Sequence, residues 1–323
     1  MNIIDYLHDS KIPFEQNVDL KRKTWIHRGG VAELFITPDN ISQLEAVVAF
    51  LYNENRDFLV IGHTSNLYIH NDHNPAIVIS TIHCNKYTIE GEYIHCECGT
   101  SVRKLAADCV SKGLKGLEYL TTLPGTVAAA IYNNSSCRDN SIASVVEDIC
   151  YISPIGGGNT LCHNELGFTF RSSSFKRHEL KGVILSVKLK LSQGNKNELL
   201  DISRNNEIER KKILEGPCQN LGCTVNRCFI NGPMPKRYAI PLTIYGKILS
   251  FFNLSIDRNK ELKKNFILRI SGYSQLIPYI SNKQMIIFVW KDEGADAAYP
   301  KYLEFMRKVY KTDKVEIEEI TNG

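Results

Sequence analysis

Residues 113–137 read GLKGLEYLTTLPGTVAAAIYNNSSC, and the interpretation of the whole chain starts from this stretch. Pro124-Gly125 marks a turn, because proline presets φ and glycine tolerates positive φ. The alanine run 128–130 has almost no side chain, so another surface can approach the backbone closely. Such a turn also leaves backbone N–H groups free for an anionic phosphate. The same residues fit a tight turn before an ordinary alanine-rich helix, and spacing alone does not separate the two interpretations.

Two further stretches have the composition of binding loops. Residues 60–67 read VIGHTSNL, a hydrophobic run that ends in a small polar loop. Residues 167–175 read GFTFRSSSF, in which Arg171 stands among aromatic and hydroxyl side chains. Together with residues 28–30 (RGG), and in this order, the stretches resemble the flavin-binding core of the UDP-N-acetylenolpyruvoylglucosamine reductase (MurB) family, within the wider vanillyl-alcohol-oxidase-like group of FAD proteins. The resemblance runs from about 29 to 187 and then weakens.

The resemblance implies an α+β fold, with two FAD-binding lobes of the PCMH type and a third α+β domain for the substrate. It places the first lobe at 1–81, with 306–323 returning to it, the second at 82–200 and the substrate domain at 201–305. Residues 1–23 are predicted to form a short helix and a polar lead-in. Hydrophobic periodicity and the resemblance together predict helices at 41–53, 101–113, 199–214 and 298–310, and strands at 58–61, 76–80, 93–98, 145–155, 182–191 and 314–320.

FAD, bound non-covalently, and NADPH are the cofactors that the resemblance implies. The loop after the strand 58–61 would hold the FAD pyrophosphate, where Gly62 keeps the backbone close and Ser65 and Asn66 donate hydrogen bonds. His63 is interpreted as a loop histidine near phosphate, although some relatives in the wider superfamily attach flavin through a histidine near this region. The predicted cofactor-binding residues are Gly62, His63, Thr64, Ser65, Asn66, Leu67, Pro124, Gly125, Thr126, Ala129 and Asn134.

Three residues are candidates for catalysis. The family reduces an enolpyruvyl ether with NADPH through the flavin, and Arg171 would grip the enolpyruvyl carboxylate with two N–H groups. Cys223 stands where the family has a serine proton donor, and a free thiol with a pKa of about 8.5 is mostly protonated at neutral pH. Glu318 aligns with the family's C-terminal glutamate, and Glu319 is the competing alignment. Structural roles for all three candidates stay open: a salt bridge for the arginine, a small buried residue for the cysteine and a solvated strand for the glutamate.

The chain departs from the family where the substrate would bind. The family's tyrosine before the arginine is Phe170 here, and the later substrate-domain segments are not matched. The first hypothesis is therefore a reductase that makes UDP-N-acetylmuramate for peptidoglycan from UDP-N-acetylglucosamine-enolpyruvate. One alternative is a diverged reductase of another enolpyruvyl or unsaturated sugar nucleotide. Another is a flavin-binding protein that has lost turnover.

Length and composition are ordinary for a globular protein: 323 residues, 43% apolar and 23% charged, with a net charge of +4. The densest basic run, 258–264, is interpreted as a solvated helix face, and the triple glycine 156–158 as a hairpin turn. The ten cysteines include no CxxC spacing, so no metal site is predicted. With neither a signal peptide nor a membrane helix in the sequence, we expect a cytoplasmic monomer with reduced thiols and no nucleic-acid or membrane partner.

Overall fold

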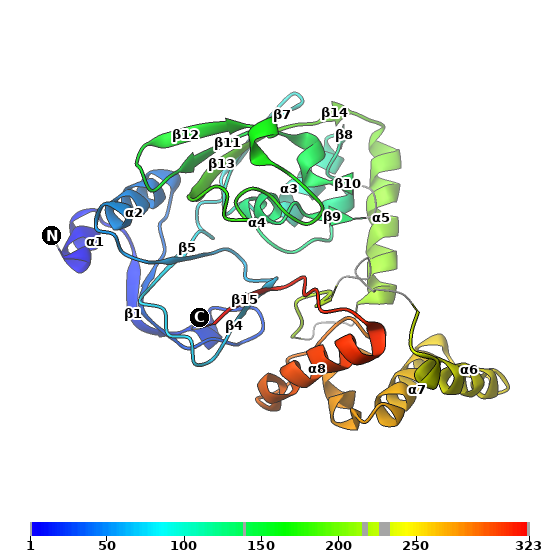
Figure 1. Ribbon diagram of the computed structural model, residues 1–323. Coiled ribbons are helices and arrows are strands. Elements are labelled where there is room, and N and C mark those ends of the chain that lie inside the picture. Colours follow the sequence, from blue (N-terminus) through cyan, green and yellow to red (C-terminus); the bar gives the residue numbers. More distant parts are fainter. Residues whose placement is uncertain (1, 138–139, 215–218, 226–232, 322–323) are drawn as a thin grey trace.

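The structure is a computed structural model that describes residues 2–137, 140–214, 219–225 and 233–321 (Figure 1). The described chain forms three regions, coloured blue to cyan, green, and yellow to red. Two regions are built on β-sheets and the third is mainly helical, with the long helix α5 (Lys196–Ile213) running between the second and the third. The predicted α+β fold class is confirmed.

The first region is a four-stranded sheet packed against helices. Its elements are α1 (Ile3–Asp9), β1 (Phe14–Asp19), β2 (Val31–Ile36), α2 (Ile41–Asn53), β3 (Leu59–Ile61) and β5 (Ile77–Ser80). The strand order is β1-β2-β5-β3, with β2, β5 and β3 parallel. Parallel strands need a crossover, and α2 provides it between β2 and β3. Helix α2 has the bounds predicted from its periodicity, and Asn40 caps it by accepting a hydrogen bond from the Gln43 N–H group.

Strand β1 differs from the sequence prediction, which places 14–19 in a polar lead-in. The segment reads FEQNVD and exposes its three middle residues, so it lacks the alternation typical of a half-buried strand. It lies at the sheet edge and pairs antiparallel with β2, with Phe14 opposite Ile36. Pairing to an apolar neighbour, and not its own hydrophobicity, makes this segment a strand.

The second region is a five-stranded antiparallel sheet with the order β12-β11-β13-β7-β6. Its main elements are β6 (Tyr87–Glu90), β7 (Tyr93–Glu97), α3 (Val102–Ser111), α4 (Val127–Tyr132), β11 (Val146–Ile152), β12 (Gly158–Cys162) and β13 (Val183–Lys190). Apolar residues of α3, α4 and the sheet form one core. The triple glycine connects β11 to β12, with Ile152 opposite Gly158, so the predicted hairpin turn is confirmed.

Short elements fill the connections between these strands and helices. They are β8 (Leu114–Lys115), β9 (Ser136–Cys137), β10 (Asn140–Ser141) and β14 (Ser192–Gln193), with 3-10 helices at Leu20–Arg22, Glu118–Leu120, Ile142–Val145 and His163–Leu166.

The third region has an aromatic core. It contains α6 (Lys236–Ser250), α7 (Ile256–Ile270), a 3-10 helix (Ser274–Tyr279) and α8 (Gly294–Tyr310). Trp290, Phe288 and Tyr302 are among its fully buried side chains. The boundary predicted at 200 falls inside α5. The boundary predicted at 305 falls inside α8, whose Val309 packs in the same core as Ile26 and Tyr68 of the first region.

The C-terminal strand does lie against the first region. Strand β15 (Glu318–Ile320) pairs in parallel with β4 (Leu67–Ile69), which directly follows the predicted phosphate loop. Two segments that are far apart in sequence therefore meet at the predicted site. The division into domains otherwise stays a prediction.

A buried ion pair joins the first and third regions. Arg28 is 6% exposed, and its Nε lies 3.0 Å from a carboxylate oxygen of Asp296 at the start of α8. Tyr68 Oη and Asn71 Nδ2 donate to the same carboxylate at 3.1 and 2.8 Å. The side chain of Asp296 thus fixes α8 relative to the first sheet.

We expect Arg28→Ala to lower the free energy of unfolding by about 2 kcal/mol, the usual effect of losing hydrogen bonds to a charged group. The loss stays moderate because Tyr68 and Asn71 still donate hydrogen bonds to Asp296. Urea denaturation measures the free energy of unfolding. The matched control is Arg258→Ala, whose pair with Glu261 is exposed and is expected to contribute less than about 1 kcal/mol. Equal effects of the two substitutions would contradict a structural role for the Arg28 pair.

Candidate flavin-binding site

The two loops predicted to bind the cofactor touch each other. A Cβ atom added at Gly62 would lie 2.7 Å from Thr126 Oγ1 and 2.9 Å from Thr126 Cγ2. Gly125 has φ +125°, and a Cβ there would lie 3.5 Å from Ser65 Oγ. Only glycine allows the first approach, because any larger side chain would meet Thr126. The loops 62–66 and 124–126 thus form one continuous surface.

This surface presents unused backbone donors. The N–H groups of residues 63–66 have no acceptor within the described part of the chain. Thr64 has φ +53°. Its Oγ1 accepts a hydrogen bond of 2.8 Å from the Trp25 N–H group, which fixes the side chain of this residue. Successive N–H groups around a left-handed residue form a concavity that binds anions. The loop therefore fits the pyrophosphate of FAD.

The alanine run forms the short helix α4. Thr126 caps it, with Oγ1 accepting a hydrogen bond of 3.3 Å from the Ala129 N–H group. Pro124 and Ala129 are exposed beside the joined loops. The predicted alanine-rich helix after the turn is thus present, and phosphate binding by the turn stays a prediction. His63 is exposed in its loop, as expected for a loop histidine.

Asn134 and Asn66 have structural partners. Asn134 is buried with φ +41°, its Nδ2 donates to Thr169 O at 2.8 Å, and its Oδ1 accepts from the Ala143 N–H group. The carbonyl of Asn66 accepts a hydrogen bond of 2.9 Å from the Glu318 N–H group. The first asparagine therefore holds the turn that carries Arg171, and the second holds the C-terminal strand.

Arg171 lies in a tight turn with a strained backbone. Thr169 and Ser172 exchange two backbone hydrogen bonds of 3.0 and 3.1 Å, and Arg171 between them has φ +55°. Its Nη2 lies 3.1 Å from Glu316 Oε1, whereas its buried Nε has no acceptor among the described residues. A non-glycine residue keeps such a conformation only where its surroundings impose it, which occurs often at functional sites. The guanidinium thus retains donor capacity, and its partner Glu316 is linked to the first loop because Asn66 Nδ2 donates to the Glu316 carbonyl at 3.4 Å.

The three glutamates near the C-terminus have different partners. Glu316 pairs with Arg171, Glu318 lies 2.5 Å from Lys176 Nζ, and Glu319 accepts a hydrogen bond from Tyr299. The sequence singled out Glu318, with Glu319 as its competitor, and missed Glu316. The signal available was strand alternation, because Glu316 and Glu318 project to the same side of an extended chain.

Charge and burial also perturb two tyrosines at this strand. Burial and then the negative charge of Glu318 raise the pKa of Tyr132. Burial raises the pKa of Tyr299, and Glu319 raises it further. Both phenols therefore stay protonated at neutral pH and serve as donors, which suits a region that holds several carboxylates.

Cys223 directly precedes Thr224, which contacts the segment just before β15. The neighbouring carbonyl of Thr224 accepts a hydrogen bond of 2.8 Å from the Glu316 N–H group. The Cys223 side chain is half-buried and packs against the aromatic core of the third region. It also interacts electrostatically with Tyr302 and Arg210, whose pKa values are raised and lowered, respectively, mainly by burial. Glu316 thus links the other two residues: its N–H group bonds the residue after Cys223, and its side chain pairs with Arg171.

The described residues contain no group of three or more histidine, cysteine, aspartate or glutamate side chains arranged to hold a metal ion. Among them, no helix has both the length and the apolar character that crossing a membrane requires.

Comparison with known proteins agrees with this geometry. The model of a family described as "FAD binding domain" matches residues 32–156, which include both loops. UDP-N-acetylenolpyruvoylglucosamine reductase of Carboxydothermus hydrogenoformans is 33% identical over 208 residues, covering 64% of this chain and 68% of that protein. The enzyme of the same name from Fervidobacterium nodosum is 29% identical over 264 residues, or 79% of this chain and 82% of that protein.

The solved structure of MurB from Thermus caldophilus superposes with a TM-score of 0.66 at 20% identity, covering 96% of this chain and 99% of that one, and supports the fold. The matched FAD-binding domain, together with the fold, defines a flavoprotein. Within that class, the chain belongs to the UDP-N-acetylenolpyruvoylglucosamine reductase (MurB) family.

Proposed function

We propose that the protein uses FAD and NADPH to reduce the enolpyruvyl group of UDP-N-acetylglucosamine-enolpyruvate, which forms UDP-N-acetylmuramate for peptidoglycan in the cytoplasm. The observation that carries this proposal is the Arg171 guanidinium, which is held in a strained turn with its Nε unpaired among the described residues. It pairs with Glu316, whose carbonyl accepts a hydrogen bond of 3.4 Å from Asn66 of the first predicted loop. The names of the relatives support the choice of substrate.

Each residue has a chemical task in this proposal. Bound FAD would supply hydride transfer from NADPH to the enolpyruvyl carbon. Arg171 binds the enolpyruvyl carboxylate and stabilises the negative charge that develops there. Glu316 orients the guanidinium through the contact at 3.1 Å. Glu318, paired with Lys176, keeps the C-terminal strand in place.

Cys223 is our proposed proton donor. We expect Cys223→Ala to slow product formation by roughly 10²-fold, which is the lower end of the effect of losing one general acid. Cys223→Ser should recover much of the rate, because serine keeps a proton on the side chain. Steady-state rates measure both variants, with the flavin content of each determined beside them. A fully active Cys223→Ala enzyme would remove the thiol from the mechanism.

Product analysis tests the proposed substrate. The purified protein is incubated with NADPH and UDP-N-acetylglucosamine-enolpyruvate, and mass spectrometry should show a product heavier by one H₂. Consumption of NADPH only with another unsaturated sugar nucleotide would favour the diverged reductase. Failure of NADPH to reduce the bound flavin would favour the protein without turnover.

We also propose that the protein acts as a monomer, which light scattering tests.

A further inference from the structure

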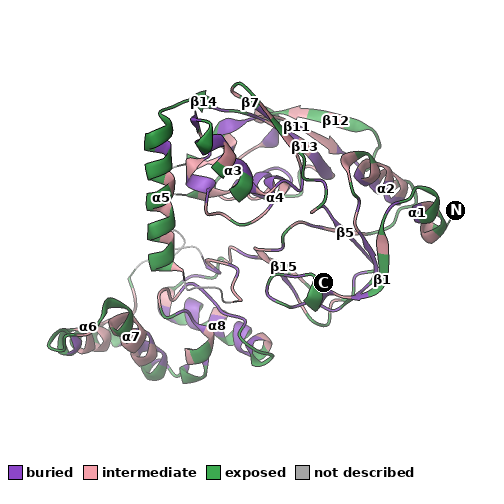
Figure 2. Cartoon of the chain, turned by 180° about the vertical axis from the view of Figure 1, so that it is seen from behind, coloured by how far each residue is buried: buried purple, intermediate pink, exposed green. Residues whose placement is uncertain are grey.

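Helix α6 turns an apolar stripe toward solvent. Ile240, Ile244 and Ile248 recur at every fourth position and are 54%, 55% and 49% exposed. Phe251 follows three residues later and is 87% exposed. At 3.6 residues per turn these four side chains, called here the α6 stripe, lie on one face of the helix. Figure 2 shows exposed residues along α6, at the end of the third region.

The turn between α6 and α7 extends this apolar surface. Phe252 is 59% exposed and Ile256 is 76% exposed. Figure 1 shows α6 and α7 as a hairpin that projects from the third region, away from both sheets. A projecting tip with two exposed phenylalanines is unusual in a water-soluble monomer, where large apolar patches mark contact sites. The stripe and the tip together form one exposed apolar surface.

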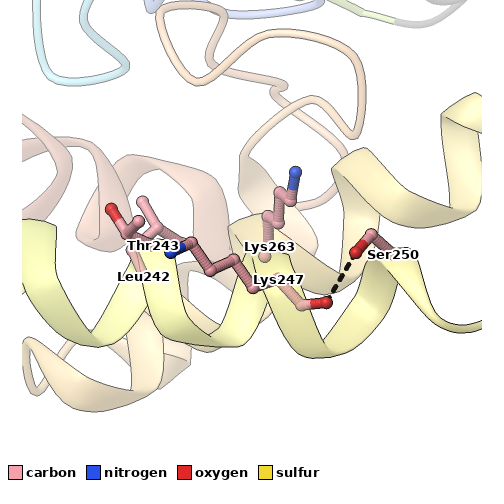
Figure 3. Close-up of a pocket in the computed structure, with 6 residues that line it drawn as sticks. Leu242, Thr243, Lys247, Ser250 and Lys263 are labelled. Carbon is pink, nitrogen blue, oxygen red and sulfur yellow. Dashed lines mark hydrogen bonds between the residues drawn. The ribbon is translucent and has the colours of Figure 1, made fainter.

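The same hairpin is strongly basic. Residues 236–270 contain eight lysines and arginines and two acidic residues, a net charge of +6, whereas the whole chain carries +4. Lys236 and Lys247 are exposed along one edge of the α6 stripe. Figure 3 shows Lys247 and Lys263 beside the hollow between the two helices, and neither belongs to an ion pair among the described residues. Lys264 is buried, with its ammonium bonded to Ile277 O and Ile280 O, so the charge available to an anionic surface is that of the exposed lysines.

We propose that the α6–α7 hairpin docks on an anionic lipid surface. The α6 stripe and Phe252 would enter the boundary between head groups and acyl chains, and the lysines would remain at the lipid phosphates. This changes the expectation of no membrane partner, which rested on the lack of a spanning segment. Peripheral docking needs an amphipathic face and not a long apolar helix.

Charge argues against a second copy of the chain as the occupant. Two hairpins of +6 would repel each other when packed face to face, and the repulsion would be strong at the short distances of an interface. A bilayer also accepts the side chains of a projecting hairpin without a complementary groove. The lipid surface is therefore the favoured partner.

The inner packing of the hairpin allows its outer face to be changed. Tyr245 and Phe266 stack between the helices, with ring centroids 4.2 Å apart. A Cβ at Gly246 would lie 3.2 Å from Lys263 Cε, so the helices are in close contact there. These contacts do not involve the α6 stripe, and substitutions in the stripe should leave the fold intact.

Vesicle flotation with the full-length protein tests the proposal. Vesicles of phosphatidylcholine with phosphatidylglycerol are compared with phosphatidylcholine alone. We expect binding to the anionic vesicles that falls as salt is raised. Phe251→Ser/Phe252→Ser should weaken binding by about tenfold or more. Lys236→Glu/Lys247→Glu should weaken it by about fivefold or more per lysine.

Ile155→Ser is the matched control, because Ile155 is 96% exposed at the hairpin of the second region and should leave binding unchanged. The thermal midpoint of each variant verifies its fold. The proposal is overturned if the parent protein ignores anionic vesicles, or if the phenylalanine variant floats as well as the parent. It is also overturned if the parent forms a dimer that this variant abolishes, without any vesicle binding.

Discussion

Arg171→Ala is expected to slow reduction of the enolpyruvyl acceptor by roughly 10²-fold or more, the scale of losing one transition-state donor. Bleaching of the flavin by NADPH should continue at the parental rate, because the guanidinium acts on the acceptor and not on the nicotinamide. Single-turnover absorbance at the flavin band separates the two half-reactions. Arg171→Lys should recover only part of the loss, since an ammonium keeps the charge but lacks the planar pair of donors.

Arg177→Ala is the control for a purely structural effect. Arg177 holds the same loop, donating hydrogen bonds to Gly167 O at 2.8 Å and to Thr169 Oγ1 at 3.2 Å, but it is exposed and paired with Glu179. If Arg171 only stabilises the loop, the two alanine variants should lose similar activity. An Arg171→Ala enzyme with the parental acceptor rate would remove the residue from the mechanism.

Gly62→Val is expected to weaken FAD binding by about 10- to 100-fold. The new Cβ would lie 2.7 Å from Thr126 Oγ1, so the two loops must move apart, and overpacking of this kind costs about 1–3 kcal/mol. Displacing the loop also misplaces the N–H groups of residues 63–66. Quenching of flavin fluorescence during titration of the apoprotein measures the affinity.

The contact itself can be tested by relief. In a Gly62→Ala variant the new methyl group would meet Thr126 and weaken FAD binding. Adding Thr126→Gly removes the atoms that this methyl group meets, so part of the affinity for FAD should return. Gly158→Ala is the control. Gly158 is exposed on β12, and its new Cβ would lie 3.5 Å from Glu45 Oε1, an ordinary contact distance. Parental affinity in Gly62→Val would place the cofactor elsewhere.

Local patterns predicted the elements that bury their own apolar faces. Helix α2 was predicted with its observed bounds because its apolar spacing and its cap agree. Strands β1 and β4 were missed, since β1 is polar and β4 is only three residues long and pairs with the distant C-terminus. Such strands depend on a partner that periodicity does not show.

The site was predicted less completely than the fold. The glycines and small residues of both loops indicated where a cofactor can approach, and the structure joins them. The role of Glu316 depends on which glutamate of an extended strand faces Arg171, and that follows from three-dimensional packing. The basic run 258–264, interrupted by Glu261, is interpreted as a solvated helix face, and the sequence does not show that the apolar stripe of the neighbouring helix α6 lies beside it. The assignments of cofactor-binding and catalytic residues remain predictions.

Anaerobic stopped-flow absorbance tests the central claim most directly. The FAD-loaded protein is mixed with NADPH and then with UDP-N-acetylglucosamine-enolpyruvate. We predict that the flavin band disappears in the first step and returns in the second, faster than with any acceptor-free control. A band that NADPH bleaches but this sugar nucleotide does not restore would contradict the proposed reaction, and a protein that fails to retain FAD would contradict the proposed site.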